Sequence, residues 1–188
     1  MNIYISGVGG QGTGMLSEIL VRAIDSAGFN FRAVDTHGLA QRGGTVVSQI
    51  RYGDEVFTPL IANGDADLVI GLELHEAFRS MEIFLKKSGT LICYDTIWEP
   101  LNVRLGEEKK ITHKEIADYC SLHDINLFFE FDKEFVDIRM QNIVLLAGLI
   151  NGNLLKGITV DHIEMAMSEI LTGNNLEQNL KVFRKNLD

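Results

Sequence analysis

A glycine-rich turn near the amino end of the chain constrains its fold more than any other feature. Residues 3–6 are a short apolar run typical of a strand, and residues 7–14 read Gly-Val-Gly-Gly-Gln-Gly-Thr-Gly. Apolar residues then recur at helical spacing from Leu16 to Ala27, and Gly28 is a typical helix stop. A strand, a glycine turn and a helix in this order predict the first unit of a parallel α/β sheet.

The rest of the chain repeats this alternation of strand and helix patterns. We expect further strands over residues 31–35, 45–52, 66–72, 90–94 and 126–131. We expect further helices over residues 73–85, 112–122, 138–150, 159–171 and 176–186. Strands interleaved with helices in 188 residues predict a single α/β domain, with a Rossmann-like, mostly parallel sheet flanked by helices.

The glycine turn is a candidate phosphate-binding site. Its spacing matches G-x-G-x-x-G, which lets the backbone approach a phosphate and directs helix N–H groups toward it. Asp35, at the end of the next predicted strand, is placed like the acid that binds ribose in dinucleotide-binding proteins. NAD, FAD, coenzyme A and other phosphate-bearing ligands all remain open, as does a turn that only packs the helix on the strand. The predicted cofactor-binding residues of the turn are Gly7, Gly9, Gly10, Gln11, Gly12 and Thr13.

A second polar loop, residues 36–44, leaves the carboxyl end of the strand predicted at 31–35. Ligands bind along that edge of a parallel sheet, so we expect this loop and the glycine turn to form one crevice. The candidate catalytic residues are His37 and Arg42, whose side chains suit an anionic or carbonyl-bearing group. In the alternative interpretation they only bond nearby backbone carbonyls. The loop's candidate cofactor-binding residues are Thr36, Gln41, Gly43 and Gly44.

Composition excludes several classes of function. With 17 Lys and Arg against 26 Asp and Glu, the net charge of −9 argues against a nucleic-acid or membrane-surface partner, because both need clustered cations. The longest apolar stretch, residues 143–150, is too short to span a bilayer. Cys93 and Cys120 are too few for a four-cysteine zinc site or an iron–sulfur cluster, so we expect no metal or covalently bound cofactor in this chain. Free thiols are typical of a reducing compartment, so we expect a cytoplasmic protein.

Two acids and four further histidines are the other side chains that could take part in chemistry. Glu73 and Glu76 share one face of a predicted helix and could perform acid–base work, although acids in a first turn more often complement the helix dipole. The histidines outside residues 36–44 lack the spacing of metal ligands, and we expect ordinary surface or capping roles for them. They are His75, His113, His123 and His162.

Three motifs in order carry a family resemblance. They are Gly-Val-Gly-Gly-Gln-Gly at 7–12, Thr-His-Gly-Leu-Ala-Gln-Arg-Gly-Gly at 36–44, and Ser-x-x-Arg at 48–51. Together they resemble the gamma-type catalytic domain of the pyruvate/ketoisovalerate and other 2-oxoacid:ferredoxin oxidoreductases, which we assign to residues 1–188. The loop at 36–44 is the most specific motif, and it favours the branch of the family that acts on indolepyruvate and related aryl pyruvates. Asp35, Leu39 and Thr45 replace the Glu, Met and Ser that the family commonly carries.

The resemblance implies an accessory subunit of an enzyme that oxidatively decarboxylates a 2-oxoacid to an acyl-CoA. Such enzymes act on the oxo group of the donor and pass electrons to an iron–sulfur protein, here ferredoxin as an indirect partner. The resemblance places thiamine diphosphate and the iron–sulfur clusters on a larger alpha subunit, and makes coenzyme A the candidate ligand of this chain. The Gly-Asp-Gly sequence that marks a thiamine site is absent, since residues 53–55 read Gly-Asp-Glu and residues 64–66 read Gly-Asp-Ala. The isolated chain is a candidate homodimer.

Two other functions are compatible with the residues alone. The glycine turn and Asp35 also fit a free-standing NAD(P)-dependent dehydrogenase, although 188 residues contain no visible second domain for a substrate. The turn and the short length also fit a non-catalytic module that senses a nucleotide or coenzyme A.

Overall fold

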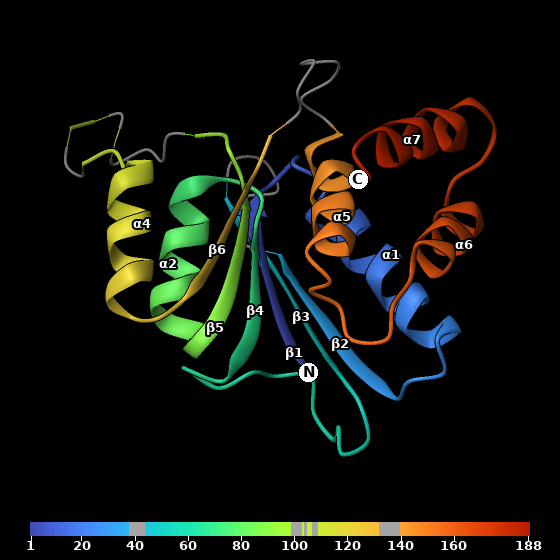
Figure 1. Cartoon of the computed structure of the whole chain (residues 1–188), viewed down its shortest axis with the longest axis horizontal. Helices are drawn as coiled ribbons and strands as arrows, with labels where there is room; N and C mark the ends of the chain where they lie inside the picture. The colour runs from blue at the N-terminus through green and yellow to red at the C-terminus, as the bar shows by residue number, and fades with distance from the viewer. Residues whose placement is uncertain (38–43, 99–102, 104, 107–108, 132–139) are drawn as a thin grey trace.

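The computed structural model describes residues 1–37, 44–98, 103, 105, 106, 109–131 and 140–188. A six-stranded sheet in the order β2-β3-β1-β4-β5-β6 lies at its centre (Figure 1). The strands are β1 (Asn2–Val8), β2 (Phe31–His37), β3 (Thr45–Tyr52), β4 (Ala66–Gly71), β5 (Leu85–Tyr94) and β6 (Asn126–Glu130).

One strand runs against the other five. β1, β4, β5 and β6 are parallel to one another, whereas β3 is antiparallel to both of its neighbours, β1 and β2. β2 ends at His37 and β3 begins at Thr45, and this connection is too short for the crossover that a parallel pair requires. The prediction of a single α/β domain with a mostly parallel sheet is therefore confirmed, with β3 inserted between β1 and β2.

Helices cover both faces of the sheet. Figure 1 shows α2 and α4 on one face and α1, α5, α6 and α7 on the other. The described helices are α1 (Thr13–Ser26), α2 (Leu74–Phe84), α4 (His113–Leu122), α5 (Gln141–Asn151), α6 (Val160–Ile170) and α7 (Gly173–Lys185). Within the described part of the chain, no helix is long and apolar enough to cross a membrane.

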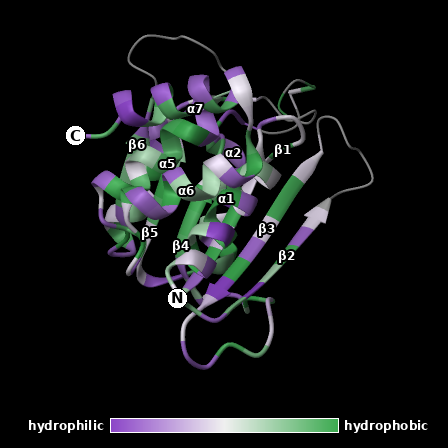
Figure 2. Ribbon diagram, turned by 90° about the vertical axis from the view of Figure 1, so that its right-hand side faces the viewer, coloured by the Kyte–Doolittle hydropathy of each residue, from purple (hydrophilic) through white to green (hydrophobic). Residues whose placement is uncertain are grey.

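Each face of the sheet has its own hydrophobic core, because successive side chains of a strand point to opposite faces. On β1, Ile3 and Ile5 pack in the core shared with α1 and α5, while Tyr4 lies in the core shared with α2. The alternation is visible along β3 in Figure 2, where hydrophobic and hydrophilic bands follow one another. Helix α5 is buried at every residue from 141 to 149, as expected of a helix that is apolar on all sides.

Most element boundaries lie within two residues of the sequence patterns, although α7 begins at Gly173 rather than at residue 176. β3 occupies the predicted residues 45–52. β5 begins at Leu85 rather than at residue 90, because Leu85 pairs with Ala66 ahead of an irregularity in the β4–β5 register. The helix predicted from residue 138 is described from Gln141, and residues 138 and 139 lie outside the described part of the chain.

Candidate ligand-binding site

The sheet has a topological switch point between β1 and β4. The helix after β1 packs on one face, and the helix after β4 packs on the other, so the two connections diverge at the carboxyl ends of adjacent parallel strands. Ligands of open α/β sheets bind in the crevice at such a point. The Leu72 N–H donates to the Ser6 carbonyl over 2.8 Å, which holds the two strand ends together beside the glycine turn.

The glycine turn is closed by its own glutamine. The Gln11 N–H donates to the Val8 carbonyl over 3.1 Å, and the Val8 N–H donates to Gln11 Oε1 over 2.7 Å. Gln11 is buried in this arrangement. Gly12 is the N-cap of α1 with φ of 84°, a left-handed conformation that glycine adopts at no steric cost.

Two glycines of this region are needed for close packing and two leave open space. A Cβ on Gly7 would lie 2.9 Å from Thr13 Oγ1, and a Cβ on Gly12 would lie 2.6 Å from Asn142 Nδ2. A Cβ on Gly10 or on Gly14 would meet no atom within 4 Å. The first pair packs the turn against the protein, and the second pair leaves backbone open to an approaching group.

The start of α1 has the chemistry of an anion site. No side chain caps the helix, its first turn carries no acid, and its first backbone N–H groups lie at the positive end of the helix dipole. Thr13 Oγ1 is buried at the same place and has no hydrogen-bond partner among the described residues. A phosphate fits such a helix start, and the buried hydroxyl is an unused donor next to it.

The described ends of the second loop lie at the same sheet edge as the glycine turn. The Gly9 N–H donates to the Gly44 carbonyl over 2.9 Å, and Thr45 pairs with Val8. The backbones of Thr36 and His37 belong to β2, which is separated from β1 by β3, or about 10 Å. Predicted residues Gln41, Arg42 and Gly43 lie outside the described part of the chain.

Asp35 does not occupy the position of a ribose-binding acid. In a dinucleotide-binding fold that acid ends the strand next to the first one, but here β3 takes that place and Asp35 lies on the edge strand. Its Oδ1 accepts a hydrogen bond from Ser17 Oγ of α1 over 3.1 Å. Asp35 therefore ties the edge strand to the helix, and this arrangement disfavours a dinucleotide site.

Glu73 has a capping role. Its carboxylate accepts hydrogen bonds from the N–H groups of His75, Glu76 and Trp98, and so caps α2 and holds the segment after β5. Burial raises the pKa of Glu73, and the three hydrogen bonds to the carboxylate oppose that rise. Glu76 is buried beside the Arg79 guanidinium at 3.5 Å. The interpretation of Glu73 as an acid that complements the helix start is the one that the geometry supports.

Two functional candidates were missed by sequence reasoning. Gln141 and Asn142, the first two residues of α5, are buried and contact the glycine turn from behind. The sequence predicts the helix that carries them, but it does not indicate that this helix packs against the glycine turn. The available signal was a pair of adjacent amides at the start of a helix that is otherwise apolar.

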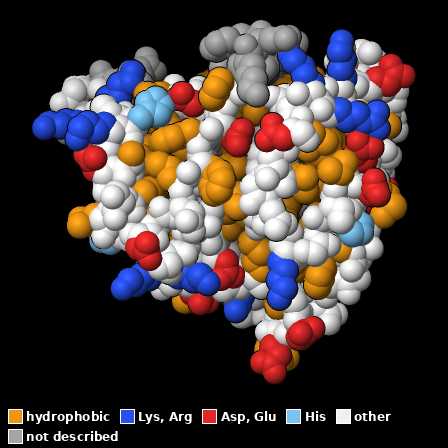
Figure 3. All heavy atoms as spheres, viewed as in Figure 1, with side chains coloured by type: hydrophobic (Ala, Val, Ile, Leu, Met, Phe, Trp, Pro, Cys, Tyr) orange, Lys and Arg blue, Asp and Glu red, His pale blue; other side chains and the backbone are white. Residues whose placement is uncertain are grey.

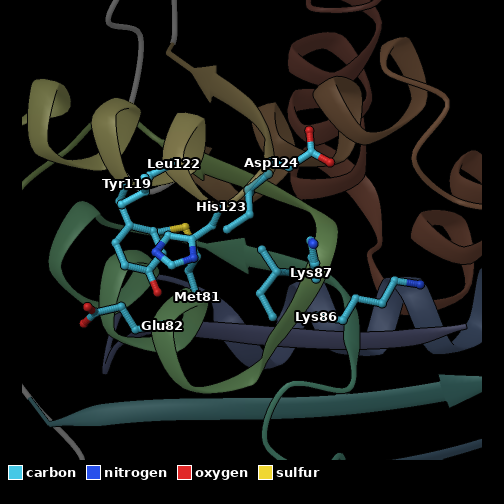
Figure 4. A pocket seen from close by; sticks show the side chains of 10 residues that line it. Met81, Glu82, Lys86, Lys87, Tyr119, Leu122, His123 and Asp124 are labelled. Atoms are coloured by element: carbon cyan, nitrogen blue, oxygen red, sulfur yellow. The ribbon is translucent and has the colours of Figure 1, made fainter.

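A separate cavity of about 600 Å³ lies between the ends of α2 and α4 and the starts of β5 and β6 (Figure 4). The rings of Tyr119 and His123 stack there with centroids 4.2 Å apart, and Leu122 is exposed at its rim. These elements meet at the amino edge of the sheet, opposite the glycine turn. The cavity is therefore not part of the candidate site.

Within the described ranges, no three His, Cys, Asp or Glu side chains converge as a metal site would require.

The chain has relatives of similar length among known proteins. It is 33% identical to indolepyruvate oxidoreductase subunit IorB of Archaeoglobus fulgidus, over 98% of this chain and 92% of that protein. It is 28% identical to the subunit of the same name from Pyrococcus horikoshii, over 97% of this chain and 92% of that protein.

Solved structures share the fold. A keto/oxoacid ferredoxin oxidoreductase gamma subunit from Geobacter sulfurreducens matches with a TM-score of 0.68 at 19% identity, over 98% of this chain and 95% of that one. A 2-oxoglutarate:ferredoxin oxidoreductase from Magnetococcus marinus, solved with 2-oxoglutarate, coenzyme A and succinyl-CoA bound, matches with a TM-score of 0.70 at 17% identity. That match covers 99% of this chain but 30% of the other. With the family model of the pyruvate ferredoxin/flavodoxin oxidoreductases matching residues 2–188, the chain belongs to that family.

Proposed function

We propose that the chain is the accessory subunit of an indolepyruvate-type 2-oxoacid:ferredoxin oxidoreductase, and that residues 1–188 form its gamma-type domain. The complex would oxidatively decarboxylate a 2-oxoacid to an acyl-CoA, with an iron–sulfur protein as the electron acceptor. The observation that carries the proposal is the glycine turn at the switch point, where the uncapped start of α1 and the unpartnered Thr13 hydroxyl fit a phosphate. The IorB relatives support the indolepyruvate branch.

The redox cofactors belong to the partner in this proposal. Cys93 and Cys120 are both buried and too few to hold an iron–sulfur cluster. Residues 53–55 and 64–66 lack the Gly-Asp-Gly pattern of a thiamine diphosphate site. This chain therefore does not fit either group, and a larger alpha subunit would carry both and pass electrons to ferredoxin. The two buried free thiols fit a reducing compartment such as the cytoplasm.

Coenzyme A is the group that this chain would hold, and it supplies the thiol that takes up the acyl group. Its phosphates would lie against the open backbone at Gly10 and Gly14 and accept hydrogen bonds from the start of α1 and from Thr13. Gly44 would form the adjoining wall of the crevice, because it is bonded to Gly9. His37 and Arg42 remain the predicted catalytic residues, from the loop that leads to Gly44.

Exposed apolar side chains support the proposal that this chain binds a partner subunit. Trp98 is 52% exposed after β5, and Phe131 is 56% exposed after β6, the neighbouring strand. The Asp95 N–H donates to the Glu130 carbonyl, so the two segments are held together at the carboxyl edge of the sheet, where the crevice also lies. Figure 3 shows hydrophobic side chains in patches over the face that carries β6. Patches of this kind commonly mark surfaces that a partner covers.

The proposal is tested by isolating the assembled complex from cell extract. We expect a larger subunit in the preparation, absorbance typical of iron–sulfur clusters, and reduction of ferredoxin that depends on indolepyruvate and coenzyme A. The chain alone should have no turnover. Turnover by the purified lone chain, or the absence of any larger partner, would contradict the proposal.

A hydroxyl deletion tests the place of the coenzyme. Thr13→Val in the assembled enzyme should raise the KM for coenzyme A about tenfold, the equivalent of one hydrogen bond to a charged group, and leave the KM for the 2-oxoacid unchanged. Thr90→Val, in β5 and away from the turn, is the matched control. An unchanged KM for coenzyme A in Thr13→Val would remove the coenzyme from the glycine turn.

A further inference from the structure

Two buried amide side chains support the glycine turn from the side opposite its open face. Gln141 Nε2 donates to the Gln11 carbonyl, and Asn142 Nδ2 donates to the Gly12 carbonyl, both over 3.4 Å. Gln141 is 2% exposed and Asn142 is fully buried. Two consecutive side chains at the start of α5 thus bind two consecutive carbonyls of a turn that lies 130 residues earlier in the sequence.

These contacts favour one direction for the turn's N–H groups. In a trans peptide the carbonyl and the N–H of the same unit point in opposite directions. The Gln11 carbonyl shares its peptide unit with the Gly12 N–H, and the Gly12 carbonyl shares its unit with the Thr13 N–H. Holding both carbonyls toward α5 therefore directs both N–H groups away from α5.

The support is specific in its geometry. Asn142 Oδ1 accepts a hydrogen bond from the Ile143 N–H over 3.0 Å, which fixes the amide with its donor toward the turn. The Gly12 carbonyl also accepts from the Leu16 N–H over 3.0 Å, so the turn and α1 are joined at the same atom. Gly12 has no room for a Cβ because Asn142 fills that space. The Asn142 amide, Gly12 and the first turn of α1 therefore form one interlocked unit.

Burying the amides of Gln141 and Asn142 in an otherwise apolar helix lowers the stability of the fold, so their presence needs an explanation. Every residue from 143 to 149 is apolar or glycine, and all are buried. A buried amide destabilises a protein unless its polar atoms are bonded, and Gln141 Oε1 has no partner among the described residues. Apolar side chains would pack α5 at lower cost, so packing of the helix does not account for this pair.

We propose that Gln141 and Asn142 are positioning residues, which orient the peptide units of the turn so that the N–H groups of Gly12 and Thr13 face the ligand's phosphate. This inference rests on the proposed function and adds to it. The amides do not contact the ligand themselves. They act through the backbone, which arrives at the phosphate already oriented and so loses little freedom on binding.

The test uses Asn142→Asp and Gln141→Glu in the assembled enzyme, since each replaces the donating amide with a carboxylate of nearly the same shape. Each should raise the KM for coenzyme A about tenfold, while the KM for the 2-oxoacid and kcat at saturating coenzyme A stay unchanged. The Kd of coenzyme A measured by calorimetry should rise by the same factor. Where a carboxylate prevents folding, Asn142→Ala removes the donor without adding charge.

A matched control separates positioning from stability. Asn179 is a buried amide on α7 that donates to the Asn175 carbonyl within its own helix over 2.7 Å. Asn179→Asp should lower the midpoint of urea unfolding and leave both the KM and the Kd of coenzyme A at the wild-type values. A rise in Asn179→Asp equal to that in Asn142→Asp would assign the effect to general loosening and overturn the inference.

The outcomes distinguish this inference from the proposed function. If Thr13→Val weakens coenzyme A binding and the Asn142 and Gln141 variants do not, the positioning role is wrong and the site stands. If all of these variants bind coenzyme A with the wild-type Kd, the turn is not the coenzyme site, and both the coenzyme assignment and the positioning role fail. If the Asn142 and Gln141 variants weaken binding as Thr13→Val does, both are supported.

Discussion

The backbone N–H of Gly9 donates to the carbonyl of Gly44, and this bond joins the glycine turn to the start of β3. It continues the β1–β3 ladder one step beyond the paired residues Val8 and Thr45. Because of it, two loops that the sequence separates meet at one edge of the sheet. A ligand at the turn would therefore have the second loop beside it.

The turn should tolerate no side chain at Gly12. Gly12→Ala should lower the free energy of unfolding by about 1–3 kcal/mol, because the residue has a positive φ and because its Cβ would strike Asn142. Urea denaturation of the wild-type and variant chains measures this difference. A loss below about 0.5 kcal/mol would mean that the turn can adopt a different conformation at this position.

Gly14 should respond in the opposite direction. Gly14→Ala lies in the first turn of α1 with open space around it, so it should raise the free energy of unfolding by about 0.5–1 kcal/mol. The added methyl group occupies the proposed approach of the phosphate, so the Kd of coenzyme A should rise several-fold. Calorimetry and urea denaturation on the same preparation measure the two effects. Glu18→Ala, on the exposed side of α1, is the control and should leave the Kd unchanged.

Asp67 should stabilise the fold at neutral pH and lose this effect at low pH. Its carboxylate accepts hydrogen bonds from Lys86 Nζ and from the Asn2 N–H, and these outweigh burial, so the pKa is lowered from 3.8. A lowered pKa means that Asp67 stabilises the fold above the ordinary pKa of the group, and that this contribution is lost as pH falls through the lowered value.

The measurement compares wild type with Asp67→Asn by urea denaturation at pH 7 and at pH 3. The variant should be less stable at pH 7, and the gap should narrow at pH 3. Asp54→Asn, an exposed aspartate in the connection after β3, should leave no such gap. An equal gap at both pH values would mean that the carboxylate charge of Asp67 does not contribute.

The chain should not bind a nicotinamide dinucleotide. Asp35 lies on the edge strand β2, where it accepts a hydrogen bond from Ser17 of α1. Strand β3 lies between β2 and β1, the strand that leads into the glycine turn. Addition of the protein should leave the fluorescence of NADH unchanged at cofactor concentrations up to millimolar. Coenzyme A should bind the same preparation in calorimetry. Saturable binding of NADH would restore the dehydrogenase as a candidate function.

The local part of this structure could be predicted from sequence, and the long-range part could not. Alternation identified β3 because one of its faces is buried, and the glycine pattern located the turn because few other residues adopt those conformations. The strand order depends on which strands pair, and no pattern within β2 or β3 indicates that β3 lies beside β1. The first residues of β5 were missed because Lys86, Lys87 and Ser88 are polar and exposed.

The same division applies to the place of the candidate site. The position of the turn between β1 and α1 was predicted because glycine chemistry is local, and the place of Gly44 beside it because the loops converge at one sheet edge. The binding role of these residues stays a prediction. Gln141 and Asn142 were missed because their contact with the turn depends on how α5 packs across the sheet, which their own neighbours in the sequence do not specify. Asp35 was misplaced because the prediction assumed that the second strand lies next to the first.

The contact between α5 and the glycine turn has a consequence for synthesis of the chain. The turn is synthesised before α5, and the amides that contact it leave the ribosome only after residue 142 has been added. Until then the nascent chain carries a turn whose carbonyls lack these two donors. These two contacts therefore form late relative to the turn itself, after the 130 residues that separate the partners have been added.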